Sequence, residues 1–213
     1  MRISELAAAS GAPITTLKFY LREGMLQRGR STSPTRAEYG PEHFDRVKLI
    51  NALINVRGLP IAKVRKILSI IDAPQGDPVE AMGSAIGALP PYDVAHESAD
   101  YPHAEAAIKS LGFTFDPNFP ATRHLEAALE GLDHAGLEWN KNILSRYRDA
   151  LIPLAEAELV PMKGMDTQEA VTYAVLGTAL YEPVILAIRR LAHRQLVETH
   201  VPKIDPETPD VRG

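Results

Sequence analysis

Cationic and aromatic side chains occur together in a short helical stretch near the N-terminus, residues 15–26, with the sequence TTLKFYLREGML. At about 100° per residue, Ile14, Leu17 and Leu21 fall on one apolar stripe. The opposite face and its two flanks carry Thr15, Thr16, Lys18, Phe19, Tyr20 and Arg22. An ordinary surface helix would carry Glu and Lys on that face, so the cations and rings together raise the question of what covers them. The simpler alternative is an ordinary amphipathic helix with two incidental aromatics.

The composition indicates a soluble globular protein without cysteine chemistry. Hydrophobic residues make up 45% of the 213 positions, which suffices to bury a core. Cysteine is absent, so disulfides, thiolate metal sites and thiol redox switches are excluded. The longest apolar run, residues 170–188, contains Glu182 and Pro183, which favours a pair of buried helices over a membrane span. The N-terminus has no secretory signal pattern, and we expect a cytoplasmic protein with no membrane partner.

The net charge of −4 hides a division between two parts of the chain. Residues 1–72 hold 12 Lys and Arg against 6 Asp and Glu, a balance of +6. Residues 73–213 hold 11 against 21, a balance of −10. A basic head joined to an acidic body fits a nucleic-acid-binding domain that carries a second domain with another role.

Glycine and proline divide the first 72 residues into four helices and one extended segment. A helix before Gly11 and a second one from Pro13 to Gly24 are joined by a tight turn, which is typical of a helix-turn-helix. Residues 27–40, QRGRSTSPTRAEYG, cannot continue a helix and predict a β-hairpin or wing that carries Arg28, Arg30 and Arg36. Apolar side chains at helical spacing predict two further helices at 41–57 and 60–71.

The rest of the chain is predicted to be all helical. Residues 72–78, DAPQGDP, indicate a linker before a short helix at 78–89 that Pro90 and Pro91 end. Apolar periodicity predicts helices at 102–112, 121–131, 136–160, 167–181 and 183–199. We therefore expect a mostly α protein: a winged helix-turn-helix domain at 1–72, a linker and short helix at 73–91, an all-helical bundle at 92–200, and a disordered tail at 201–213.

The N-terminal residues 2–26, RISELAAASGAPITTLKFYLREGML, resemble the start of the MerR family of bacterial transcription regulators. The family pattern is I-x-E-L-A, a turn with glycine, and T-[LIV]-[RK]-[YF]-Y-x-R-x-G-[LM]-L, and this chain meets each fixed position in order. The similarity continues through TRAEYGPEHFDRVKLI at 35–50 and RGLPIAKVRKIL at 57–68. It implies a regulator that binds double-stranded promoter DNA with RNA polymerase nearby.

The resemblance also assigns contacts to single residues. Thr15 and Lys18 would meet base edges and phosphates in the major groove, with Phe19, Tyr20 and Arg22 against the DNA backbone. Thr16 matches the same family motif and joins this candidate interface. Flanking phosphates are assigned to Arg36, Tyr39 and Lys63, and charge alone adds Arg28 and Arg30.

One departure from the family concerns dimerisation. Typical members continue after the fourth helix into a long helix that pairs with its twin, but Pro74, Gly76 and Pro78 interrupt such a helix here. A homodimer is still expected because the family reads two-fold symmetric operators. The interface is then placed either in the C-terminal bundle or in the short helix at 78–89.

The bundle contains no motif for catalysis, for a metal or for a cofactor. His96 and His103, or His124 and His134, are too far apart for one helical face to chelate a metal, and we expect no enzyme. Aromatic residues and one lone carboxylate offer a candidate small-molecule site made of Trp139, Tyr147, Tyr173, Tyr181 and Glu182, with a plain hydrophobic core as the alternative. Glu182 would pair with Arg189, Arg190 or a neighbouring helix, or meet a cationic ligand.

Three functions remain open on the sequence alone. The first is a regulator that responds to a small hydrophobic effector. The second is a regulator of the same type with no small-molecule input, whose bundle serves only dimerisation or protein contacts. The third is an enzyme or drug-sequestering protein with a DNA-binding head, for which no catalytic motif is present.

Overall fold

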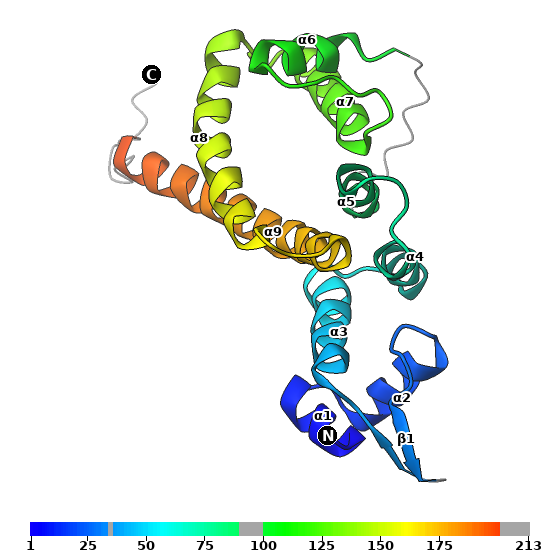
Figure 1. Ribbon diagram of the computed structural model, residues 1–213. Helices are drawn as coiled ribbons and strands as arrows, with labels where there is room; N and C mark the ends of the chain where they lie inside the picture. Colours follow the sequence, from blue (N-terminus) through cyan, green and yellow to red (C-terminus); the bar gives the residue numbers. More distant parts are fainter. Residues whose placement is uncertain (34–35, 90–99, 201–213) are drawn as a thin grey trace, which may run out of the picture.

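The computed structural model describes residues 1–33, 36–89 and 100–200, and in these ranges the chain is mostly helical (Figure 1). The N-terminal region comprises α1 (Ile3–Ser10), α2 (Ile14–Arg22), β1 (Arg30–Ser33), β2 (Arg36–Glu38), α3 (Pro41–Asn51), the π-helical turn η1 (Ala52–Val56) and α4 (Ile61–Asp72). The remainder comprises α5 (Pro78–Gly87), α6 (Pro102–Leu111), α7 (Pro120–His134), α8 (Lys141–Leu159), the 3-10 turn η2 (Val160–Met162) and α9 (Thr167–His200). The predicted fold class is confirmed.

The wing is an antiparallel hairpin in which Arg30 pairs with Glu38 and Ser31 with Ala37. Gly29 precedes it where a Cβ atom would lie 2.5 Å from the carbonyl oxygen of Glu38, so only glycine fits this close approach. The expected helix-free segment at 27–40 therefore forms the predicted β-hairpin.

Two helix boundaries in the C-terminal half differ from the prediction. The helix expected from 136 begins at Lys141, because α7 continues to His134 and the Asn140 side chain caps α8 by accepting the N–H groups of Asn142 and Ile143 at 3.0 Å each. The two helices expected at 167–181 and 183–199 are one helix, α9, which passes through Pro183. A proline removes one backbone hydrogen bond, and the packing of the first half of α9 in the main core offsets this loss. The predicted tail at 201–213 lies outside the described residues.

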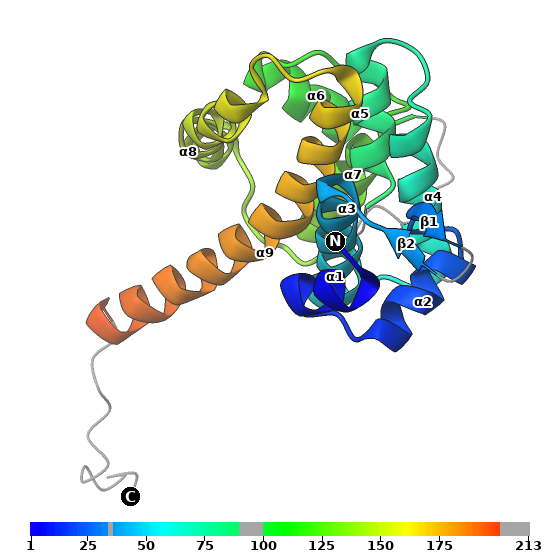
Figure 2. The ribbon, with the colours of Figure 1, turned by 60° about the horizontal axis from the view of Figure 1, so that its bottom comes forward.

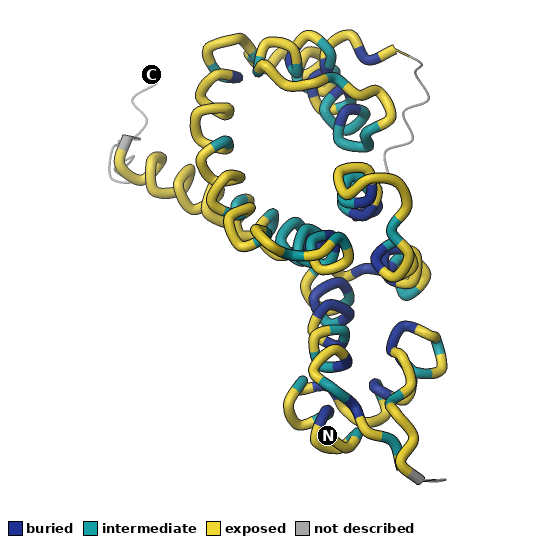
Figure 3. The backbone as a smooth tube through the Cα atoms, viewed as in Figure 1, coloured by how far each residue is buried: buried dark blue, intermediate teal, exposed yellow. Residues whose placement is uncertain are grey.

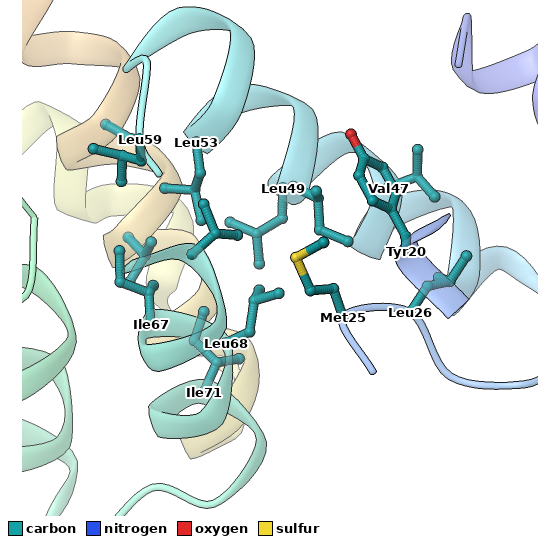
Figure 4. Packing of buried hydrophobic residues seen from close by; sticks show 14 of the residues in the cluster. Tyr20, Met25, Leu26, Val47, Leu49, Leu53, Leu59, Ile67, Leu68 and Ile71 are labelled. Carbon is teal, nitrogen blue, oxygen red and sulfur yellow. The ribbon is translucent and has the colours of Figure 1, made fainter. Parts of the chain in front are cut away.

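The main hydrophobic core includes side chains from the N-terminal helices and from α9. Figure 4 shows a part of this core that runs from Tyr20 to Ile71. Leu6, Leu17 and Leu53 of the N-terminal helices are fully buried in it. It also contains side chains of α5 and of the first half of α9: Ala81, Ala85, Val171, Val175 and Ala179. The core thus crosses the expected boundaries at 72 and 92, because α9 packs on α5, α4 and η1.

A smaller core joins α6, α7 and the start of α8. Ala107, Leu129 and Leu144 are its buried members, and Trp139 packs against them. From there α8 runs back toward α9 (Figure 1) and is largely exposed along its length (Figure 3). The second half of α9 extends away from the other helices (Figure 2).

Among the described helices, α9 is long and apolar enough over Thr167–Thr199 to cross a membrane, by length and composition alone. Its first half is packed in the main core through Val171, Val175 and Ala179, each with no exposed surface. Core helices of soluble proteins meet the same criterion. We therefore interpret α9 as a core helix with a projecting end.

Candidate nucleic-acid interface

The helix-turn-helix is built by α1, a three-residue turn and α2. Gly11 adopts a left-handed conformation with a φ of 68°, which ends α1 at no steric cost. Pro13 then precedes the first residue of α2, and Leu6, Ala12 and Leu17 are buried between the helices. This packing fixes the direction of α2 and leaves its opposite face at the surface.

The outer face of α2 presents the side chains that the sequence proposed for DNA. Thr15, Lys18 and Arg22 are exposed, and their spacing of three and four residues places them on one face. Thr16 and Phe19 are half-buried, and the Phe19 ring also packs against the core. In both ribbon views the wing lies beside α2, so the hairpin extends the same end of the molecule (Figures 1 and 2).

The two tyrosines predicted to contact DNA, Tyr20 and Tyr39, are both buried. Tyr20 is only 3% exposed, and its hydroxyl donates to the Asn51 Oδ1 at 3.2 Å. Burial raises the pKa of the Tyr20 phenol. The buried stripe of α2 runs through Leu17 and Tyr20, whereas Ile14, expected inside, is 39% exposed.

Tyr39 is buried as well, at 7% exposed, and its ring forms a T-shaped contact with the His43 ring, with centroids 5.1 Å apart. Its backbone ties the end of the wing to the N-terminus. The Met1 ammonium donates to the Tyr39 carbonyl at 2.8 Å, and the Tyr39 N–H donates to the Met1 carbonyl at 2.8 Å. Tyr39 therefore positions the wing from inside the domain.

The basic residues of the N-terminal domain divide into structural and surface groups. Arg46 binds the Asp72 carboxylate with two hydrogen bonds, at 2.9 and 2.6 Å, and its Nε donates to the Met25 carbonyl at 2.8 Å. Arg65 pairs with Glu23 at 3.1 Å. The side chains of Arg28, Arg30 and Arg36 are exposed, and Lys63 is half-buried at the start of α4. The surface group is the one that can meet phosphates.

The five residues predicted for a ligand do not gather in one place. Trp139 and Tyr147 lie together, with ring centroids 5.5 Å apart. Tyr173 and Tyr181 on α9 share a side-chain hydrogen bond, and the pKa of Tyr173 is raised chiefly by it. Glu182 pairs with Arg57 at the end of η1, with 3.0 Å between Oε2 and Nη2. A neighbouring helical segment, and neither Arg189 nor Arg190, therefore supplies the partner of this carboxylate.

The Arg57–Glu182 pair is largely shielded from water, with side chains 11% and 27% exposed. Burial raises the pKa of the Glu182 carboxyl, and the Arg57 charge and hydrogen bond oppose that rise. The pair joins Arg57, which directly follows η1 in the N-terminal domain, to the middle of α9. It is a direct polar link between the head and the C-terminal half.

A cavity of about 820 Å³ lies between α6, α7 and the start of α8. Of the five predicted ligand residues it includes Trp139 alone. Sequence reasoning missed its polar members His103, Asp133 and Glu138, which come from two helices and a turn. The sequence signal that could have indicated this acidic site is the spacing of Glu126, Glu130 and Asp133, which places three carboxylates on one face of a helix.

The helix-turn-helix, the hairpin and the exposed face of α2 define a winged helix-turn-helix DNA-binding domain. Residues 1–70 match the family described as MerR HTH family regulatory protein. Residues 1–70 thus form a MerR-type helix-turn-helix domain, the kind of domain found in DNA-binding transcriptional regulators.

One solved structure is similar to the whole chain. It is that of the candidate transcriptional regulator SCO5550 from Streptomyces coelicolor A3(2), with 25% sequence identity and a TM-score of 0.76. The similarity covers 96% of this chain and 100% of that one. No curated protein sequence matches the chain.

Proposed function

We propose that this regulator binds promoter DNA as a homodimer, with α2 in the major groove and the wing on the flanking backbone. The observation that carries the proposal is the exposed face of α2, where Thr15, Lys18 and Arg22 stand on a helix held from behind by Leu17 and Tyr20. Side chains on a rigid helix can read base edges, because their positions are fixed by the core. RNA polymerase at the same promoter, in the cytoplasm, is the machinery on which such a regulator acts.

Replacing Lys18 or Thr15 by alanine should weaken operator binding by about 1–3 kcal/mol if a base contact is lost. Binding to random DNA should change far less, since that binding depends on phosphates. Both affinities are measured by fluorescence anisotropy at one salt concentration. Lys163→Ala, which removes an exposed cation between α8 and α9, is the matched control. Equal losses on operator and random DNA would reduce Lys18 and Thr15 to phosphate contacts.

The wing arginines should act through phosphates, because they are exposed on or beside a two-stranded hairpin. Neutralising Arg28, Arg30 or Arg36 should flatten the plot of log affinity against log salt concentration by about one unit of slope. The slope is measured by titrating the operator at several salt concentrations. An unchanged slope for all three variants would remove the wing from the interface.

Homodimerisation is proposed through the exposed apolar faces of the C-terminal helices. Of the 19 large hydrophobic residues that are exposed in the described ranges, 12 lie on α8 and α9. Exposed apolar patches of this kind mark interaction sites. The alternative interface, the short helix at 78–89, has its Ala81 and Ala85 buried in the main core. The distribution therefore favours α8 and α9.

We also propose that a small-molecule effector binds in the C-terminal half. Because Glu182 is paired with Arg57, that carboxylate gives no support to a cationic ligand at α9. The cavity beside Trp139 is the better supported location for a small hydrophobic effector, since its size falls within the usual range for ligand pockets. A regulator with no small-molecule input remains the alternative function, and a cavity that binds nothing would favour it.

A further inference from the structure

The cavity beside Trp139 has an apolar wall and an aromatic edge. Its buried wall is formed by Ala107, Leu129 and Leu144, which also make up the smaller core. The Trp139 side chain lines it, and the Tyr147 ring supports the indole at an interplanar angle of 42°. An apolar cavity with a few polar groups at its rim is the usual form of a small-molecule site.

The charged groups around this cavity are mostly acidic. Asp133 and Glu138 line it directly, against the single lining ammonium of Lys141 among the described residues. The Glu138 carboxylate accepts a hydrogen bond from the Asn140 side chain, which holds it at the rim. Glu126 and Glu130 precede Asp133 on the same face of α7. Carboxylates therefore outnumber the lining ammonium around this cavity.

His103 is the other titratable group of the lining, and it belongs to the capping of α6. Its Nδ1 lies 2.7 Å from the Glu126 Oε1, and the Glu126 Oε2 accepts the Ala104 N–H at 2.6 Å. The hydrogen bond to Glu126 raises the pKa of His103. Burial alone would raise the pKa of Glu126, but the N–H of Ala104 and the His103 ring more than offset this and lower it.

We interpret the His103, Glu126 and Glu130 cluster as structural. The ligand atoms of His103, Glu126 and Glu130 lie within 4.8 Å of one another. Both oxygens of Glu126 already accept hydrogen bonds from the first turn of α6. A metal would have to displace these bonds, and we assign the cluster to fixing α6 against α7.

We propose that the cavity binds a flat aromatic cation, which stacks on the Trp139 indole with its positive charge toward Asp133 and Glu138. A cation over an indole face is attracted by the ring and gains more when water is excluded. The two carboxylates add attraction for a cation and repel an anion of the same size. This inference rests on the proposed effector response and gives it a site and a ligand class.

The test uses two aromatic dyes of opposite charge, thioflavin T as the cation and 1-anilinonaphthalene-8-sulfonate as the anion. Trp139 is the only tryptophan in the chain, so its quenching reports a dye bound in the neighbourhood of this cavity, and the variants below locate it. Thioflavin T should quench Trp139 in a saturable one-to-one titration of the full-length protein, and the anion should bind at least tenfold more weakly. Equal binding of both dyes, or of neither, overturns the proposal.

Variants then place the cation within the cavity. Asp133→Asn and Glu138→Gln should each weaken thioflavin T binding about two- to fivefold, the range expected for exposed charges. Ala106→Phe, which puts a ring into the cavity from an exposed position on α6, should abolish it. Asp149→Asn removes an exposed charge of α8 outside the lining and should have no effect. An equal loss with Asp149→Asn would mean that the dye follows the overall charge, and the site assignment would be wrong.

Operator titrations separate this inference from the proposed function. Operator binding without dye tests the DNA-binding proposal, whatever the dyes do. Saturating thioflavin T should then change operator affinity about 5- to 150-fold if the cavity is an effector site, because effector coupling is typically of that size. Dye binding with unchanged operator affinity would uphold the cavity as a cation site and overturn the effector response.

Discussion

A chain with Val175→Asp should lose operator binding because its DNA-binding head no longer folds. Val175 lies on α9 with no exposed surface, in the same core as Leu17 of α2 and Leu53 of η1. An aspartate there would be a buried charge with no built partner, which costs about 3–5 kcal/mol. Since whole domains are stable by only about 5–15 kcal/mol, this single change removes much of the total. The substitution would thus destabilise packing around Leu17, which lies more than 150 residues earlier in the sequence.

The measurement is urea unfolding followed by circular dichroism, with operator affinity determined in parallel. Val79→Asp is the matched control, because Val79 is 73% exposed on α5 and the same charge stays in water there. Its unfolding midpoint should remain close to that of the wild type. A Val175→Asp chain with wild-type stability and full operator binding would show that the head folds without α9.

The packing of α9 against α5 and the N-terminal domain also affects whether that domain can be studied as an isolated fragment. A fragment of residues 1–90 lacks Val171, Val175 and Ala179, and it also lacks Glu182, the partner of Arg57. It exposes the face of α5 that α9 covers. Such a fragment would lose stability together with the proposed dimer interface, so point variants within the full chain separate the two properties better.

Local patterns in the sequence predicted the head well because its elements depend on local chemistry. The glycine and proline positions between residues 11 and 41 set the turn and the wing, and apolar spacing set the two helices that follow. The sequence predicted less accurately which side chains of α2 are buried. Tyr20 lies 60° from Leu17 around the helix, at the edge of the apolar stripe. An aromatic side chain at such an edge can be buried when a partner such as Asn51 accepts a hydrogen bond from its hydroxyl.

The position of α9 could not be predicted from local patterns. Its apolar run indicated burial, but no residue of the run specifies α5 and η1 as the packing partners. Pro183 suggested a break, whereas α9 continues through it, held on its N-terminal side by core packing and by the Arg57–Glu182 pair. The cavity was missed for a similar reason, since His103, Asp133 and Glu138 approach one another only when α6, α7 and the following turn fold together.

A double variant, Ile188→Asp with Leu191→Asp, should convert the proposed dimer into a monomer while the head stays folded. Both side chains are at least 60% exposed on the projecting half of α9, so the change leaves the main core intact. With Leu180 and Val184 they form one apolar stripe, at spacings of three and four residues. Two carboxylates in a paired stripe would raise the dissociation constant of the dimer about 100-fold or more, since central apolar contacts dominate such interfaces.

Sedimentation equilibrium at low micromolar concentration measures the change, and urea unfolding checks that the monomer is native. His193→Asp is the control, because residue 193 lies on the opposite side of α9 from the stripe and is exposed. It should leave the dimer intact. The monomeric variant should bind a single half-site as tightly as one wild-type subunit does, yet lose the added affinity for the two-fold operator. A double variant that stayed dimeric would move the interface to the exposed face of α8, where Tyr147, Leu151 and Leu154 lie.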